Sequence, residues 1–180
     1  MNGLIFTEFM EMVETTWSFD MVDTLIDRSQ VGSGGIYTAV GSYPHEEMVA
    51  LINALAEETQ LPIDQIERTF GQYLFSRFMR EYPQYFTGIR DSFQFLARID
   101  EIVRPIFRKH FPDNEPPTIQ VEQSPGRLSL SNFSAPFFIH LAQGLIEGCI
   151  SHFGGNEVLQ RESVPDLAST KARFVITRSA

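Results

Sequence analysis

The chain has 180 residues, of which 43% are hydrophobic and 21% charged, so it suffices for one domain or two joined subdomains and excludes bulk disorder. Its formal net charge of -9 argues against nucleic acid as a partner, because phosphate binding needs clustered Lys and Arg. The charge is uneven, since residues 1–67 hold twelve acidic residues and one basic residue, Arg28. The aromatic residues are mostly apolar, with 16 Phe against 5 Tyr and 1 Trp.

The single cysteine, Cys149, excludes an intramolecular disulfide and a multi-cysteine metal site, and it fits a reducing compartment. The first residues lack the basic region and the cleavage site of a signal peptide. No apolar run approaches the roughly 20 residues that span a bilayer. We therefore expect a cytoplasmic protein that does not enter a membrane.

The N-terminal third predicts three helices. Apolar residues recur at helical spacing in residues 4–13, and Ser18–Asp27 has an apolar face opposite three aspartates. The Gly/Ser-rich stretch Gln30–Tyr43 predicts a loop. A helix then runs from Pro44 to about Thr59, because proline is favoured in the first turn of a helix.

The middle of the chain predicts two longer helices. Pro62 opens a helix that runs through Tyr82, with apolar residues stacked at every fourth position. A loop at Pro83–Gly88 separates it from a helix over about Asp91–Phe111.

After Pro112 the pattern alternates, which is typical of strands. Residues 119–121 and 128–130 flank the turn Ser124-Pro125-Gly126 and predict a hairpin. A helix follows over Phe137–Phe153, and residues 157–162 and 173–178 predict two more strands. This order, with helices first and strands later, predicts an α+β fold with a helical N-terminal part.

No group of residues predicts catalysis or metal binding, so we expect that the chain is not an enzyme. The histidines have no metal-ligand spacing, and three of them fall on polar stripes or helix ends: His110, His140 and His152. Cys149 lies on an apolar helix face, which favours a buried structural role over a nucleophile. The glycines at 32–35 lack the lysine of a phosphate-binding loop.

A series of short stretches, in order over nearly the whole chain, resembles the heme nitric oxide/oxygen binding (H-NOX) domains. They are Met1–Phe6, Ser42–Pro44 with Glu46-Glu47, Leu55–Thr59 with Pro62, Phe70–Phe75, Phe95-Leu96 before Ile99–Ile102, Arg108–Pro112, Pro116-Pro117, and Gly144–Gly148 before His152-Phe153.

The resemblance implies one H-NOX-like domain over residues 1–180. It would consist of a helical N-terminal subdomain, residues 1–65, packed on a C-terminal subdomain, residues 66–180, with helices and a four-stranded antiparallel sheet. Heme lies between the two subdomains in that family. The resemblance also implies a sensory module that signals to a partner, commonly a histidine kinase, a cyclic-di-nucleotide enzyme or a chemotaxis protein.

Two departures from the family pattern bear on the cofactor. The position of the iron-ligating histidine is Arg104, whose protonated guanidinium has no lone pair for iron. Arg104 lies within one helical turn of Asp100 and Glu101, so an ion pair worth about 0.3–0.5 kcal/mol is the plain interpretation. Pro105 follows and removes a backbone donor, so we also expect a kink there.

The second departure concerns the Y-x-S-x-R motif that binds the heme propionates in the family. Its positions are Asn132, Ser134 and Pro136, so only the serine is kept and the cation that would pair with a carboxylate is absent. The resemblance implies heme, but these replacements predict that the usual heme binding is lost.

The resemblance also places a set of residues along the former heme pocket. They are Ile5, Phe9, Leu74, Phe78, Leu96, Ile99, Pro117, Leu141 and Leu145. Leu141 corresponds to the distal tyrosine of oxygen-binding members, and Pro117 to the proline that presses on the heme.

Three hypotheses follow for this space, since a void of heme size costs several kcal/mol. Phenylalanine side chains fill it and only a protein-interaction function remains, or it holds an apolar ligand such as a fatty acid. The third is heme held by an unconventional ligand, such as His110 or His140, in a nitric oxide sensor with altered ligation.

Overall fold

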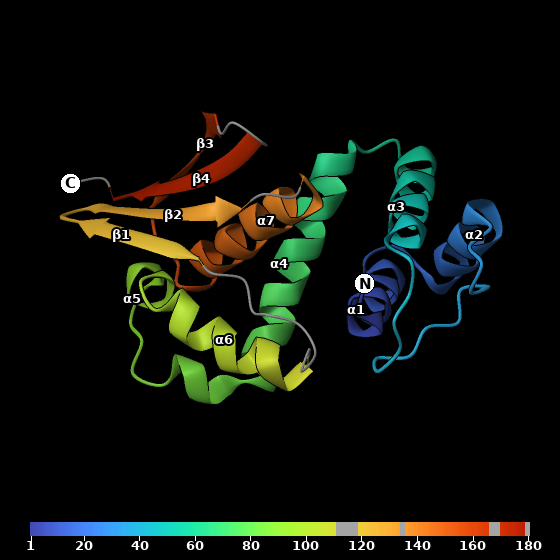
Figure 1. Ribbon diagram of the computed structural model, residues 1–180, viewed down its shortest axis with the longest axis horizontal. Coiled ribbons are helices and arrows are strands. Elements are labelled where there is room, and N and C mark those ends of the chain that lie inside the picture. Colours follow the sequence, from blue (N-terminus) through green and yellow to red (C-terminus); the bar gives the residue numbers. More distant parts are fainter. Residues whose placement is uncertain (111–118, 134–135, 166–169, 179–180) are drawn as a thin grey trace. The chain divides into compact units, whose positions relative to one another are not determined.

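The computed structural model describes residues 1–110, 119–133, 136–165 and 170–178. Seven α-helices and four strands are described, and contacts divide the chain into two compact units, Met1–Phe70 and Gly71–Ala180. The elements are α1 Gly3–Thr16, α2 Phe19–Ser29, α3 His45–Thr59, α4 Ile63–Glu81, a 3-10 helix η1 Pro83–Phe86, α5 Ser92–Leu96, α6 Ile99–His110, β1 Gln120–Ser124, β2 Arg127–Phe133, α7 Pro136–His152, β3 Val158–Pro165 and β4 Thr170–Thr177 (Figure 1).

The first unit is helical, and short polar side chains start its helices. Asn2 accepts a hydrogen bond from the Leu4 N–H at 2.8 Å and caps α1. Ser18 caps α2 in the same way through the Met21 N–H. The core of this unit is apolar, and Phe9 meets Phe70 edge to face at 5.3 Å between ring centroids.

The second unit contains the sheet, whose strand order is β1-β2-β4-β3 with every neighbouring pair antiparallel. The predicted hairpin is confirmed, since Ser124 pairs with Arg127 across the turn and Gly126 has φ 70°. The central strands are the most buried, because Leu128, Leu130 and Phe174 are at most 1% exposed. The predicted α+β class is therefore confirmed.

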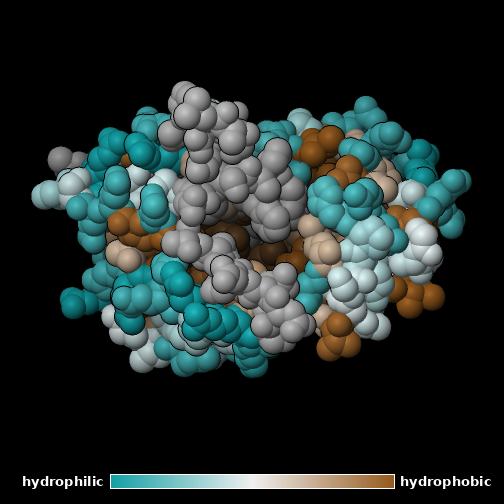
Figure 2. All heavy atoms as spheres, viewed as in Figure 1, coloured by the Kyte–Doolittle hydropathy of each residue, from teal (hydrophilic) through white to brown (hydrophobic). Residues whose placement is uncertain are grey.

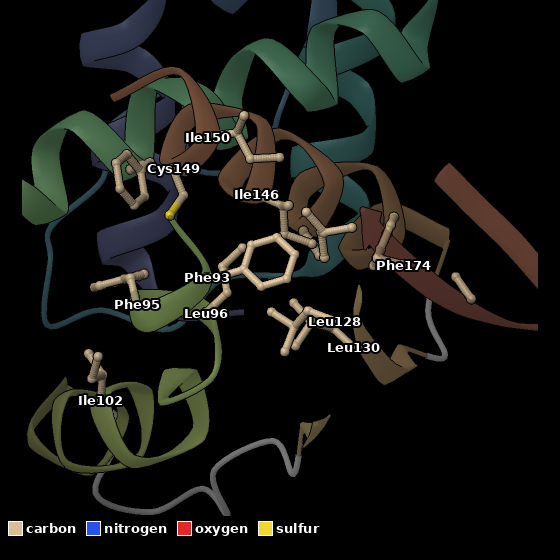
Figure 3. Packing of buried hydrophobic residues seen from close by; sticks show 14 residues of the cluster. Phe93, Phe95, Leu96, Ile102, Leu128, Leu130, Ile146, Cys149, Ile150 and Phe174 are labelled. Carbon is tan, nitrogen blue, oxygen red and sulfur yellow. The ribbon is translucent and has the colours of Figure 1, made fainter. Parts of the chain in front are cut away.

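One hydrophobic cluster joins α4, α5, α6 and α7 to the sheet of the second unit. Figure 3 shows Phe93 beside Leu128 and Leu130, with Ile146 of α7 close by. Cys149 is fully buried in this cluster, as expected from its apolar helix face. Burial raises the pKa of its thiol, which keeps it in the unreactive protonated form.

One expectation about local structure was wrong. The segment Asp91–Phe111 does not form one helix, because Asp91 caps the short α5 and the chain turns at Ala97 and Arg98 before α6 begins. This break lets both short helices direct apolar side chains into the same cluster, which one straight helix could not do. The expected loop at Pro83–Gly88 contains η1, with proline in its first turn.

Candidate functional site

Helix α6 carries Arg104, the residue that the resemblance is expected to place at the family's iron-ligand position. Its guanidinium donates two hydrogen bonds to one carboxylate oxygen of Asp100, from Nη2 at 2.6 Å and from Nε at 3.2 Å. The alternative neighbour, Glu101, instead pairs with Arg98 at 3.3 Å. Arg104 is thus held one turn back along its own helix and has its charge compensated there.

Asp100 has a second partner that fixes its orientation. Its other oxygen accepts a hydrogen bond from the Ile119 N–H at 3.2 Å, which ties α6 to the residue just before β1. The hydrogen bond from Arg104 lowers the pKa of the Asp100 carboxyl, burial opposes this, and the Ile119 N–H adds to the lowering. Asp100 is therefore ionised and holds both Arg104 and the backbone at Ile119 in place.

Several of the residues expected along the former heme pocket belong to the hydrophobic cluster of the second unit. Leu96 is 2% exposed within it, and Phe78, Ile99 and Leu145 are partly buried against it. Phe78 also lies 5.4 Å from the ring of Phe86. The structure thus places these four residues around one apolar core.

The remaining candidates are distributed differently. Ile5 and Phe9 lie on α1 in the first unit, where Phe9 is fully buried and Ile5 partly buried. In the second unit, Leu74 lies partly buried on α4, and Leu141 is 6% exposed on α7.

The positions expected to correspond to the propionate motif lie at the edge of what the structure describes. Ser134 and Pro117 fall outside the described residues. Asn132 lies in β2 and Pro136 begins α7, and their side chains are not described.

Helices α4 and α7 cross closely next to the candidate pocket residues. A Cβ on Gly71 would lie 2.2 Å from the Leu141 carbonyl oxygen and 2.8 Å from the Leu145 nitrogen. The crossing therefore requires glycine at this position, since both obstacles are backbone atoms. The side chains of Gln72 and Glu147 also join the two helices through a 2.8 Å hydrogen bond.

The histidines considered as unconventional ligands lie in different surroundings. Within the described part of the chain, no group of three or more His, Cys, Asp or Glu residues could hold a metal ion. His152 lies against aromatic rings, 4.8 Å from Phe153 and 6.2 Å from Phe75. His140 is partly buried on α7, and the His110 side chain lies outside the described part.

A partly exposed polar cluster around the buried Glu157 side chain of the second unit was missed by sequence reasoning. Arg178 bonds Glu157 at 3.2 Å and Asp91 at 2.9 Å, and its guanidinium lies 4.3 Å from the Phe93 ring centroid. The Glu157 side chain is 4% exposed and also accepts from the Ser92 hydroxyl at 2.9 Å.

These residues come from three distant parts of the chain, so no local spacing could show that they meet. The one sequence signal is the Asp-Ser pair before an apolar run, which predicts the start of α5 but not the partners. A surface pocket of about 780 Å³ lies here, between α5, the β1–β2 turn and Arg178.

In the described residues, no helix has both the length and the apolar character that a bilayer span requires.

Comparisons with known proteins agree with this architecture. The haem-NO-binding family matches residues 2–160. The structure of the Fe(II) unliganded H-NOX protein from K. algicida is 31% identical, with a TM-score of 0.84 over 100% of this chain and 97% of that chain. The IWP-051-bound H-NOX from Shewanella woodyi, in the Fe(II)CO state, is also 31% identical, with a TM-score of 0.81 over 99% of this chain and 95% of that one.

A more distant H-NOX protein from S. oneidensis shares 19% identity and the same fold, with a TM-score of 0.83 over 100% of both chains. The comparison with curated proteins finds no match. The family match over most of the chain, together with the two structures at 31% identity, is decisive. The chain therefore belongs to the haem-NO-binding (H-NOX) family of sensory domains.

Proposed function

We propose that the chain is a regulatory H-NOX domain that does not bind heme through a proximal side chain of α6. It acts as a non-enzymatic, cytoplasmic signalling module, through a partner protein or an apolar ligand in the former heme pocket. The observation that carries this proposal is the two-bond pairing of Arg104 with Asp100 on α6.

The residues at this position do not fit an iron ligand. A guanidinium stays protonated and offers no lone pair, and here its donors already face Asp100. Moving Arg104 away would leave the half-buried Asp100 carboxylate with only the Ile119 N–H. The replacements at Asn132 and Pro136 support the same conclusion, because they remove a phenol and a cation that would hold propionates.

The signalling partner is proposed from the family alone, as a histidine kinase, a cyclic-di-nucleotide enzyme or a chemotaxis protein. The presence of a single cysteine in the chain fits a reducing compartment. The aromatic cluster around Phe78, Phe86 and Phe95 supports a filled apolar interior in the second unit.

An absorption spectrum of the purified protein, before and after addition of hemin, tests the proposal. We expect no Soret band at first and only the broad absorption of free hemin afterwards. Arg104→His combined with Asn132→Tyr and Pro136→Arg is expected to raise hemin affinity by about tenfold or more. Arg98→His is the matched control, since this exposed arginine precedes α6, and it is expected to change nothing.

A sharp Soret band in the unmodified protein, saturating at one heme per chain, would contradict the proposal. Native mass spectrometry of freshly purified protein then separates the remaining hypotheses. A discrete added mass supports the apolar ligand, and its absence supports a module that acts through a partner alone.

The second candidate is a heme-based nitric oxide sensor with altered ligation. The observation that favours it is the 31% identity to H-NOX proteins whose structures are described in Fe(II) states. Under this alternative, hemin produces a Soret band that shifts with nitric oxide, and His140→Ala or His110→Ala abolishes it.

A further inference from the structure

The loop between α2 and α3 exposes aliphatic side chains in a part of the chain with no charge of its own. No charged residue occurs from position 29 to position 44. Ile36 is 76% exposed and Val40 is 95% exposed, although both are fully apolar. Figure 2 shows that hydrophobic residues reach the surface in several separate places among hydrophilic ones. Single exposed aliphatic residues are common on protein surfaces, so Ile36 and Val40 carry an argument only together with the fixed loop, the groove and the charge described next.

Side chains of α1 and α3 hold this loop in place. The Tyr37 ring stacks on Phe6 at 4.5 Å and meets Tyr43 edge to face at 4.8 Å. The Glu47 carboxylate accepts three hydrogen bonds, from the Ser33 N–H, the Ser33 hydroxyl and the Tyr37 hydroxyl. These bonds lower the pKa of Glu47 against the opposing effect of burial, so the clamp is ionised.

The backbone of the loop is also tied to the start of α1. The Gly3 N–H donates to the Gly41 carbonyl at 2.8 Å, and the Tyr43 N–H donates to the Met1 carbonyl at 2.9 Å. Gly41 has no room for a side chain, because a Cβ there would lie 2.6 Å from the Tyr43 ring. The loop therefore presents Ile36 and Val40 in a fixed arrangement, which lowers the entropic cost of binding.

A small groove of about 230 Å³ adjoins the loop, between α1 and α2. Met10, Val22 and Tyr37 line it, and Glu14 is exposed at its rim. Its volume suits a single side chain with an aliphatic stem and a cationic end, such as lysine or arginine.

The exposed face of α2 adds a row of carboxylates. Asp20, Asp23 and Asp27 are all exposed and lie three and four residues apart, so they follow one side of the helix. The one basic residue of α2, Arg28, is occupied by Glu58 at 2.7 Å. The negative charge of this face is therefore not compensated by α2 itself.

The groove connects the loop to α2, because Gly35 and Tyr37 of the loop and Val22 of α2 all line it. We propose that Ile36, Val40, this groove and the α2 aspartates together form a docking surface that binds a basic amphipathic segment of a partner protein. The aliphatic residues of the segment cover Ile36 and Val40, while its lysines or arginines face the aspartates and the groove. This inference rests on the proposed partner-mediated function and names the chemistry of the partner.

Charge decides between a basic segment and other occupants. Residues 1–67 carry a net charge of -11, so a second copy of this unit would bring like charge to like charge. The same charge repels anionic lipid and nucleic acid. A basic partner is attracted, and its association is accelerated at low salt.

An NMR titration of the isotope-labelled full chain tests the proposal. The probe is a synthetic helical peptide with leucines on one face and lysines on the other. We expect chemical-shift changes at Ile36, Val40 and α2, and we expect the peptide to bind more weakly as the salt concentration rises. The same peptide with glutamate in place of lysine is expected not to bind.

Two variants and their matched controls locate the interaction. Ile36→Ser with Val40→Ser is expected to weaken peptide binding by about tenfold, whereas Val158→Ser, an exposed aliphatic residue of the second unit, is not. Asp20→Asn, Asp23→Asn and Asp27→Asn together are expected to weaken binding and flatten its salt dependence. Their control neutralises three exposed acidic residues elsewhere in the first unit: Glu46→Gln, Glu57→Gln and Asp64→Asn.

The following outcomes overturn the proposal: shifts confined to the second unit, equal binding of the glutamate peptide, or no binding. Concentration-dependent shifts without peptide would identify a second copy as the occupant, and binding to phosphatidylglycerol vesicles would identify a lipid surface. Either result replaces the proposed partner. None of these readouts depends on heme, so a Soret band would overturn the proposed function and leave this surface to be judged separately.

Discussion

At the scale of single residues, the contribution of a carboxylate to stability depends on the arginine that pairs with it and on how deeply the pair is buried. Asp100 and Glu157 both pair with an arginine, but the Asp100 side chain is 29% exposed and that of Glu157 only 4%. Burial makes the loss of a partner much more costly, because water cannot replace it. We therefore expect the loss of the arginine partner to destabilise the fold more at Glu157 than at Asp100.

Asp100→Asn is expected to lower the free energy of unfolding by about 1 kcal/mol at pH 7, through the lost pairing with Arg104. The pKa of Asp100 is depressed in the folded state, so its contribution is present above about pH 4 and is lost as the pH falls through the folded value. Urea unfolding of both proteins between pH 7 and pH 2 measures this.

The control for Asp100 is Glu101→Gln, whose pair with Arg98 is exposed and is expected to contribute less than about 0.5 kcal/mol. A difference between Asp100→Asn and the unmodified protein that persists unchanged at pH 2 would contradict the assignment to ionisation.

Arg178→Met is expected to destabilise the fold by about 2–3 kcal/mol, because Glu157 is left buried without its cation. Arg127→Met is the control, since its 3.8 Å pair with Glu162 is exposed, and it is expected to change stability by less than about 0.5 kcal/mol. Thermal unfolding of the variants measures both.

The double variant Arg178→Met with Glu157→Gln separates an ion pair from simple packing. It is expected to be more stable than Arg178→Met alone, because the unpaired buried charge is gone. Additive losses would show that the two side chains act independently.

At the scale of elements, the close crossing of α4 and α7 is the most demanding contact. Gly71→Ala gains about 1 kcal/mol of helix propensity, but its Cβ meets backbone atoms that cannot move aside. We expect a net loss of about 1–2 kcal/mol in the free energy of unfolding, measured by denaturant titration.

Gly148→Ala provides the comparison on α7, because its Cβ would meet the Phe75 side chain at 3.0 Å and backbone only at 3.4 Å. We expect it to cost less than Gly71→Ala. The reverse order would mean that α4 and α7 can separate more easily than their geometry indicates.

The elements also show how far local patterns determine structure. Asn2 and Ser18 cap helices that the apolar spacing predicts. Gly126 lies in the turn between the two stretches of alternating residues that form the hairpin. The apolar pattern of residues 91–111 predicts one helix, because nothing in its local sequence excludes a helical Ala97 and Arg98. The structure has two helices there, and both Phe95 of α5 and Ile102 of α6 are buried in one cluster with the sheet, a long-range contact that the local pattern does not contain.

At the scale of the whole molecule, the uneven charge has a measurable effect. Like charges in residues 1–67 repel one another, so raising salt from about 0.02 M to about 0.2 M is expected to stabilise the fold by about 1 kcal/mol, or about 2–4 °C. Differential scanning calorimetry measures the increase.

Neutralising Asp20, Asp23 and Asp27 to Asn is expected to raise the melting temperature at low salt and to reduce the further gain from added salt. A melting temperature independent of salt in the unmodified protein would show that the carboxylates are too well solvated to repel.

The sequence by itself determined the α+β class, the sheet-forming hairpin, the burial of Cys149 and membership of the H-NOX family. These features depend on local periodicity, turn chemistry and ordered motifs, which neighbouring residues encode. It also identified Arg104 as unable to bind iron, since this follows from the chemistry of a guanidinium.

Only the tertiary structure decided that Arg104 is bound by Asp100 while Glu101 turns to Arg98, although both acids are within one helical turn. It also brought Asp91, Glu157 and Arg178 together. It further exposed Ile36 and Val40 on a loop that hydrogen bonds to Glu47 hold in place. The contacts of Arg178 and of the loop join residues far apart in the chain, and the choice of Arg104 between two neighbouring acids depends on what surrounds each acid. No local pattern contains either kind of information.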